Sequence, residues 1–510
     1  MQVNNINNYN FDNNYSLAFG ATKQQYQSAV KYLKSQKRAA VRMMIGEQFR
    51  RILDGIKYHY PWAILKKRIH LNPFYYVFSN TMKADNLSNY GIKTLNVDKL
   101  DGIQYGIDVF NDLSMREILF VLYKTVNLAV SRGCNNMCEH CFLDAKPADK
   151  SKLNSMPYED FEKISNGFTE LNERINKTLK NKNKNSLIGK LSNSLIDGRF
   201  PASMTALFYD SDGMSILLKD KNGKEYDFVD LSEMFTEATG KHMLFDTAGW
   251  NPKNKKMQER AEKYAEYFAR PYAKNKVEQV NLSVNTFNPL YTKAYKLGYR
   301  SGAENDLSNP DIKLGKQLYD RYINKIANML VTFRDAKTAS LLMTFSTDIE
   351  KNMEGYYFSD LEKILSDVEK RCIEILKEKY PKKADVKKEL VKITNIKKRA
   401  IDRYKNDYYD KSRFRNVYAG RYIELLNSKN SSTKTFKDKR YTSPVSNINV
   451  LSDKEYQRFF ENYESVIDTN GNIYYYQYDN DISIRPLGKK LNISTNGKDT
   501  APLSGLESRP

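Results

Sequence analysis

Hydrophobic positions along the centre of the chain follow two periods in alternation. Short runs rich in β-branched and aromatic residues predict strands, while apolar residues spaced three or four apart predict amphipathic helices. The strands are expected at 203–209, 242–247, 277–285 and 339–345. The helices are expected at 158–174, 230–239, 254–269, 313–330 and 358–379. Strands that alternate with helices favour a parallel sheet with right-handed crossovers.

A further apolar segment precedes a loop that contains a glycine. Residues 119–122 and 126–130 predict one buried strand, which ends at Ser131, Arg132 and Gly133. With this strand, residues 115–379 hold five strand–helix units. The pattern therefore predicts an α/β fold for the middle of the chain.

The cysteines are concentrated directly after that loop. The chain has four cysteines, and three of them, Cys134, Cys138 and Cys141, fall within eight positions. Buried structural cysteines scatter through a core, and three clustered thiols do not form a disulfide framework. The cluster therefore predicts a metal site. The fourth cysteine, Cys372, lies in a Lys/Glu-rich helical stretch where its spacing indicates a small core residue.

The residues alone leave two metals open. A structural zinc site takes four ligands, usually as two separated pairs. His140 is a possible fourth zinc ligand, although its place between Cys138 and Cys141 is cramped. Iron–sulfur clusters ordinarily take four cysteine thiolates, so a loop with three leaves one iron open to a reactant.

The Cys-x3-Cys-x2-Cys spacing, with Asn135 after the first cysteine and the aromatic ring of His140 before the last, resembles the cluster loop of the radical S-adenosylmethionine (SAM) enzymes. The resemblance implies that the three cysteines hold one [4Fe-4S] cluster and that SAM chelates its fourth iron. It also implies an electron donor such as flavodoxin or ferredoxin. One electron would cleave SAM to methionine and a 5′-deoxyadenosyl radical, which takes a hydrogen atom from the substrate.

The same resemblance implies a fold and a place for the site. The expected fold is a partial (β/α)6 TIM-like barrel over residues 115–379, with its site at the C-terminal ends of the strands. The family's second strand often ends in Gly-Gly-Glu, which binds the SAM amino group, whereas this chain has Ser211, Asp212 and Gly213. Asp212, with Ser211 beside it, is the candidate for the SAM ammonium group. An ordinary Asp/Ser/Gly turn explains the same three residues equally well.

Two further strand ends fit the family pattern. Residues 247–249, Thr-Ala-Gly, resemble the Thr-Asn-Gly that commonly ends the third strand. Ser283 and Asn285 alternate onto one face of the fourth predicted strand, where the family places polar side chains against SAM. Two polar residues that merely fill a barrel interior would show the same pattern.

Charge is concentrated in two flanking zones. Residues 22–69 carry a formal charge of +10 and residues 371–440 carry +13, against +21 for the whole chain, so the remainder sums to −2. A genome rich in Lys and Asn codons would raise basicity, but it would also have charged the centre. The two zones therefore predict contact with a polyanion.

The flanks also set the expected domain boundaries. Residues 1–20 predict a mobile polar arm, 21–114 a basic and mainly helical extension, 380–493 a basic helical segment with a hairpin at 465–487, and 494–510 a disordered tail. Residues 23–56 in particular have helical spacing. No apolar run suffices for a membrane span and no secretory signal precedes the chain, so a cytoplasmic protein is expected.

The substrate class stays open between two candidates. The hairpin at 465–487 faintly resembles the C-terminal extension of peptide-modifying radical SAM enzymes, which favours a peptide or protein. That extension binds extra clusters through cysteines that this chain lacks, so one cluster is expected. The localised basicity favours RNA instead. The alternative outside this family is a non-enzymatic, zinc-loop nucleic-acid-binding protein.

Overall fold

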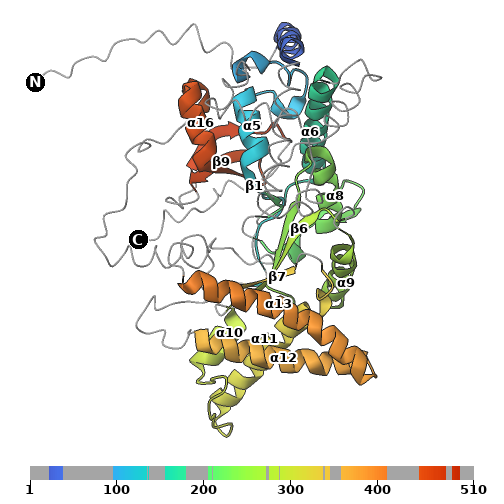
Figure 1. The fold of residues 1–510 in the computed structure, drawn as a ribbon, viewed down its shortest axis with the longest axis vertical. Helices are drawn as coiled ribbons and strands as arrows, with labels where there is room; N and C mark the ends of the chain where they lie inside the picture. The colour runs from blue at the N-terminus through green and yellow to red at the C-terminus, as the bar shows by residue number, and fades with distance from the viewer. Residues whose placement is uncertain are drawn as a thin grey trace, which may run out of the picture.

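A computed structural model of the chain supports a description of most of its central part. The described residues are 22–37, 96–134, 136, 155–179, 205–208, 211–271, 275–285, 288–336, 339–344, 358–409, 447–477 and 485–493. The remaining residues are drawn as a thin grey trace in Figure 1. Within the described ranges, no helix is both long and apolar enough to cross a bilayer.

The described part is a mixed α/β fold built on one mostly parallel sheet. Its strand order is β10-β9-β8-β1-β2-β5-β6-β7 (Figure 1). The strands are β1 (Thr125–Leu128), β2 (Thr205–Ala206), β5 (Met243–Thr247), β6 (Val277–Asn285), β7 (Ala339–Thr344), β8 (Tyr463–Ile467), β9 (Asn472–Gln477) and β10 (Arg485–Lys490). The strands from β8 to β7 pair in parallel, and β9 and β10 add an antiparallel edge. The predicted α/β class and parallel sheet are confirmed.

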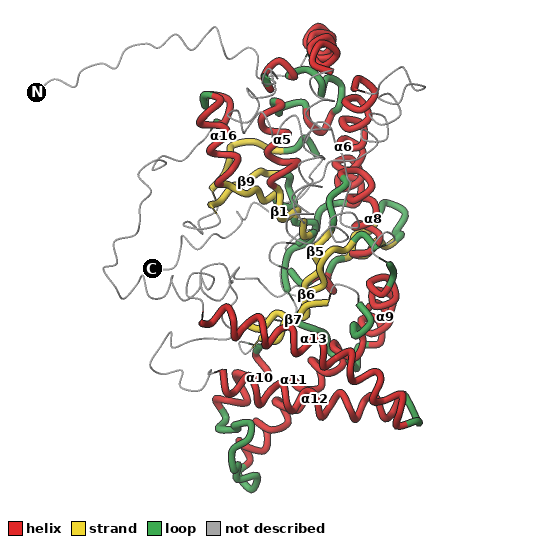
Figure 2. Tube along the Cα trace, viewed as in Figure 1, coloured by secondary structure: helices red, strands yellow, loops and turns green. Residues whose placement is uncertain are grey.

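Helices follow the strands along the chain in the order that the pattern predicted. Figure 2 distinguishes the helices, in red, from the strands, in yellow. They are α6 (Tyr158–Leu179), α8 (Phe228–Thr239), α9 (Lys255–Ala269), α10 (Pro289–Lys296), α11 (Pro310–Thr332), α12 (Phe358–Lys379) and α13 (Lys383–Tyr409). From β1 through β2, β5 and β6 to β7, each strand lies beside the one before it, with no reversal of direction. Right-handed crossovers in one direction place their helices on one face of the sheet.

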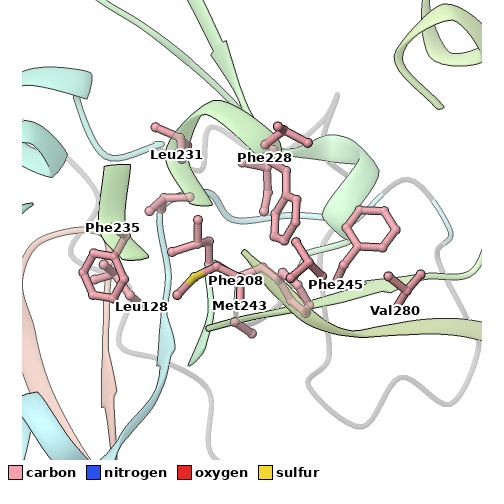
Figure 3. Packing of buried hydrophobic residues seen from close by; sticks show 14 of the residues in the cluster. Leu128, Phe208, Phe228, Leu231, Phe235, Met243, Phe245 and Val280 are labelled. Carbon is pink, nitrogen blue, oxygen red and sulfur yellow. The ribbon is translucent and has the colours of Figure 1, made fainter. Parts of the chain in front are cut away.

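Aromatic residues fill the space between that face and its helices. Phe245 of β5 is fully buried, and its ring lies 5.0 Å from the ring of Phe228 in α8 (Figure 3). It also lies 5.0 Å from the ring of Phe268 in α9. The ring of Phe333, which follows α11, lies 5.8 Å away. Val280 of β6 is the register partner of Phe245 and shares this face. Burial of several such rings contributes roughly 2 kcal/mol each to the core.

The predicted strand over 119–130 is wrong in its first half. Residues Met115–Lys124 form a helix, α5, and only Thr125–Leu128 form a strand. Ser114 caps this helix: its hydroxyl accepts from the N–H of Glu117, and the Glu117 carboxylate accepts from the N–H of Ser114. Nearly all of α5 is buried, and its continuous apolar run over residues 118–123 resembles a buried strand.

The other predicted elements agree with the structure within a few residues, apart from one strand. Of the strand expected at 203–209, Thr205–Ala206 form β2, and residues 203, 204 and 209 lie outside the described residues. The strand expected at 277–285 and the helix expected at 358–379 match β6 and α12. The sequence analysis missed α10, α16 (Asp453–Asn462) and the hairpin of β3 (Leu217–Lys219) and β4 (Glu225–Asp227). Of the helix expected at 23–56, residues 23–37 are helical and the rest lies outside the described residues.

The predicted C-terminal hairpin forms, and it joins the main sheet. β8 pairs in parallel with β1, so that Ile467 accepts a hydrogen bond from the N–H of Ala129 at 2.8 Å. The turn after β8 is held by Asp468, whose carboxylate accepts from the N–H groups of Asn470 and Asn472 at 2.9 and 2.8 Å. This turn lies at the same edge of the sheet as the residues that follow β1. The C-terminal strands β8, β9 and β10 thus belong to the central sheet.

The opposite edge of the sheet carries a layer of helices. α11 packs on α10 and α12, and α13 packs on α12 and β7, as the lower part of Figure 1 shows. Cys372 of α12 is completely buried, and its thiol donates to the carbonyl of Ala327 at 3.7 Å. Its predicted role as a core residue is confirmed.

A lysine is buried at the N-terminal edge of the sheet. Lys241 precedes β5, is only 1% exposed and donates from Nζ to the carbonyl oxygen of Thr125 at 2.9 Å. The side chains of Leu128, Phe168 and Phe235 lie around it. Burial, with the nearby charge of Lys124, lowers the pKa of Lys241 from 10.5 to about 7.

We expect Lys241→Met to raise the free energy of unfolding, most of all below about pH 7. The folded protein releases this proton at about pH 7 and the unfolded chain at 10.5. The unfolded chain therefore binds more protons between these values, and the penalty for burying the lysine fades there by up to ~1.4 kcal/mol per pH unit. Urea unfolding of both proteins at about pH 6 and about pH 9 measures the difference.

Lys221→Met is the control, because Lys221 is an exposed lysine in the β3–β4 turn. It removes the same charge and should leave the pH dependence of unfolding close to wild type. Parallel stability curves for Lys241→Met and wild type would show that the folded protein does not bury this charge.

Candidate functional site

The C-terminal ends of β1, β2 and β5 bring the cysteine loop and the Asp212 turn together. Gly133 pairs in parallel with Ser211 beyond the ends of β1 and β2. The hydroxyl of Ser131 lies 3.5 Å from that of Ser211. Because parallel strands end at a common edge, two segments 80 residues apart form one surface. This is the edge at which the sequence predicted a site.

Cys134 begins the loop, and its side chain is half-buried. Its Sγ accepts from the backbone N–H of Asn136 at 3.4 Å and from the Asn136 side-chain amide at 3.7 Å. N–H groups that point at a sulfur favour its thiolate form, which is the form that binds metals. Asn136 itself is 9% exposed, so these contacts are largely shielded from water.

Asp212 joins the loop to the end of β5. Its carboxylate accepts from the N–H of Met214 at 2.9 Å, from the N–H of Ala248 at 2.9 Å and from the amide of Asn136 at 2.8 Å. Burial raises the pKa of Asp212, and these hydrogen bonds and the charge of Lys325 oppose that rise. The carboxylate therefore links three separate segments, although the sequence analysis placed it against a ligand.

The second acidic group at this edge is Asp246 of β5. Burial raises the pKa of Asp246 to about 7, the charge of Asp212 adds to the rise, and a hydrogen bond from Asn281 lowers it. Asn281 is the register partner of Asp246 on β6, and its Oδ1 accepts from Gln279 at 2.6 Å. Oδ1 of Asp246 is buried and has no hydrogen-bond partner among the described residues. It is thus an acceptor at the site that a ligand could satisfy.

Asp246 and Asn281 lie on the face of the sheet opposite the crossover helices. Asn127 is on the same face and donates from its amide to the carbonyl of Phe208 at 2.8 Å. Ser283 follows Asn281 by two positions on β6 and is half-buried. A parallel sheet is usually apolar on both faces, so a polar face indicates a place for polar ligand groups.

The predicted site residues differ in how far the structure describes them. Cys134, Ser211, Asp212 and Gly213 lie together at the strand ends, and Ser283 lies further along the polar face. Asn285 ends β6 and is in register with Thr344 of β7. The predicted ligands Cys138 and Cys141, and the possible zinc ligand His140, lie outside the described residues. Within the described ranges, no group of three or more metal-ligating side chains occurs.

Three residues of this site were missed by the sequence analysis, namely Asn136, Asp246 and Lys325. Lys325 of α11 donates from Nζ to Oδ1 of Asn136. Asp246 gave a usable signal, because an acidic residue within an otherwise apolar strand needs a partner or a function. Asn136 and Lys325 gave none, since their role depends on a contact across 189 positions of sequence.

Most of the two basic zones lies outside the described residues, which include only 22–37 of the first zone and 371–409 of the second. The predicted polyanion contact and electron donor therefore stay predictions.

We expect Gly213→Ala to destabilise the protein by about 1–3 kcal/mol. An added Cβ would lie 2.6 Å and 2.7 Å from two ring carbons of Phe245, and 2.9 Å from the carbonyl oxygen of Asp246. Relief of that overlap would push the Asp212 turn away from β5. Chemical denaturation of the variant and of wild type measures the loss.

Gly223→Ala serves for comparison, because nothing lies within 4 Å of a Cβ there and only its φ of +81° opposes the change. The loss at Gly213 should exceed that at Gly223. Equal losses would mean that the turn and β5 are not in close contact.

Comparison with known proteins adds no relative. No family model matches the chain, and no curated protein or solved structure matches it. The function is therefore inferred from the residues of this chain alone.

Proposed function

We propose that the chain is a radical SAM enzyme that binds one [4Fe-4S] cluster through Cys134, Cys138 and Cys141. The observation that carries the proposal is the Cys-x3-Cys-x2-Cys loop, whose first cysteine lies at the C-terminal edge of a parallel sheet. Enzyme sites on sheets of this kind gather at that edge. The substrate is a peptide or protein, or an RNA.

The described surroundings of Cys134 fit such a cluster. Its sulfur accepts two N–H groups from Asn136, as cluster-bound thiolates commonly do. A cluster of this type supplies one electron for the reductive cleavage of SAM. The protein has to hold SAM and the substrate in place and exclude water from the site.

The polar groups at the strand ends suit the binding of SAM. Asp212 and Ser211 stay the candidates for its ammonium group, and Ser283 and Asn285 the candidates for its other polar atoms. A carboxylate has about four acceptor positions, and Asp212 fills them within the protein with Asn136, Met214, Ala248 and the side chain of Thr247. Asp246 offers the open acceptor that Asp212 lacks.

The strand order supports the partial barrel that this function implies. Strands that each lie beside the preceding one, with crossover helices on one face, wind in the way of a barrel. A doubly wound sheet would instead reverse its order at a switch point. We therefore assign the polar face as the inside of a partial (β/α)6 barrel.

We expect Cys134→Ala, Cys138→Ala and Cys141→Ala each to abolish cluster binding. Each change removes one of three thiolates, and two thiolates hold a cluster too weakly to survive desalting. Anaerobic reconstitution, followed by absorption spectroscopy and iron analysis, measures the cluster. Cys372→Ala is the matched control, since that buried thiol packs against α11 and should leave iron content unchanged.

Retention of a brown cluster in any of the three loop variants would contradict the ligand assignment. A colourless protein that binds zinc through the same cysteines would support the zinc-loop nucleic-acid-binding alternative instead.

We expect the reconstituted, reduced protein to convert SAM slowly to 5′-deoxyadenosine without added substrate. A cluster held by Cys134, Cys138 and Cys141 would leave one iron without a protein ligand for SAM and would supply the electron that cleaves the bond between the SAM sulfur and C5′. Chromatography of the reaction with dithionite measures the product, with Cys138→Ala as the control. Bound cluster without any cleavage of SAM would restrict the chain to a non-catalytic role.

A further inference from the structure

Lys325 connects a distant helix to the first turn of the cysteine loop. It lies in α11, and its Nζ donates to Oδ1 of Asn136. The remaining polar groups of Asn136 point at Cys134 and Asp212. The side chains of Lys325 and Asn136 therefore connect α11 to Cys134, the first predicted cluster ligand.

The turn after β5 leaves space for the side chain of Lys325, because a glycine lies against it. Gly249 has a φ of +81°, and a Cβ there would lie 3.3 Å from Cγ and 3.3 Å from Cε of Lys325. The stem of the lysine thus lies directly on the backbone of this glycine. The N–H of Gly249 donates to the hydroxyl of Thr247 at 3.0 Å, which holds the turn beneath the stem.

The resulting contacts form a closed ring. Ala248, next to Gly249, donates to Asp212; Asp212 accepts from Asn136; and Asn136 accepts from Lys325, whose stem returns over Gly249. The ring places one ammonium group beside a buried carboxylate and within two side chains of Cys134. Charge-assisted hydrogen bonds of this kind are the stronger class.

We propose that Lys325 is a positioning residue that orders the first turn of the cysteine loop through Asn136, and that its positive charge raises the reduction potential of a cluster bound there. The second part rests on the proposed function, whereas the first does not. Reduction by one electron, taken from a low-potential donor such as flavodoxin, ferredoxin or dithionite, adds one negative charge to the site. A neighbouring positive charge stabilises that reduced state more than the oxidised one.

Lys325→Met removes both the charge and the hydrogen bond, while Lys325→Arg keeps both. In the full chain without iron, we expect the amide hydrogens at residues 133–136 to exchange about tenfold faster or more in Lys325→Met than in wild type. Lys325→Arg should restore slow exchange. Lys316→Met is the matched control, because Lys316 lies on the same helix and pairs with Asp320 at 2.6 Å, away from the loop.

The potential separates a charge effect from a purely structural one. In reconstituted protein, redox titration followed by electron paramagnetic resonance should give a lower midpoint potential for Lys325→Met and for Lys325→Gln, but not for Lys325→Arg or Lys316→Met. Lys325→Gln is neutral and can still donate to Asn136, so it tests the charge even where Lys325→Met folds poorly.

Each outcome decides one part of the proposal. Unchanged exchange at residues 133–136 in Lys325→Met would overturn the positioning role. Faster exchange with an unchanged potential would overturn the electrostatic role. If wild type takes up no cluster, the proposed function fails, and the exchange experiment still decides whether Lys325 orders the loop.

Discussion

The site depends on one buried carboxylate. Asp212 accepts hydrogen bonds from its own turn, from the end of β5 and from Asn136 in the cysteine loop. Without these donors, a charged carboxylate in this buried position would cost more free energy. The hydrogen bonds therefore hold the three segments that supply them close to one another. Protein contacts thus orient the first turn of the loop, so that Cys134 is held in position without a bound metal.

Sequence patterns predicted the strand–helix alternation well where each element has one buried face. β6 and α12 match their predicted bounds, because polar residues mark their ends and their outer sides. α5 was mistaken for a strand because residues 118–123 form a short, continuous apolar run, although its Ser114–Glu117 capping box was visible in the sequence. Of the strand expected at 203–209, the described residues place Thr205 and Ala206 in β2, where they pair with β5 and Ala206 also pairs with Asn127 of β1.

The candidate site was predictable only in its chemistry-bearing residues. The spacing of Cys134, Cys138 and Cys141 is local, so it can be recognised without a fold. The roles of Asn136 and Lys325 arise from a contact between the loop and α11, and no local pattern specifies such a contact. The role of Asp212 was not predictable for the same reason, because its hydrogen bonds come from Asn136 and Ala248, which lie far before and far after it in the sequence.

The pairing of β8 with β1 has a consequence for biosynthesis. A ribosome releases the chain from its N-terminus, so β1 and the cysteine loop emerge more than 300 residues before Tyr463–Ile467. Until then one edge of β1 has unpaired N–H and C=O groups, which are a template for association with other chains. A translation product that stops before β8 would keep this edge open. The sheet beside the cysteine loop is therefore completed only after the C-terminal part of the chain has been synthesised.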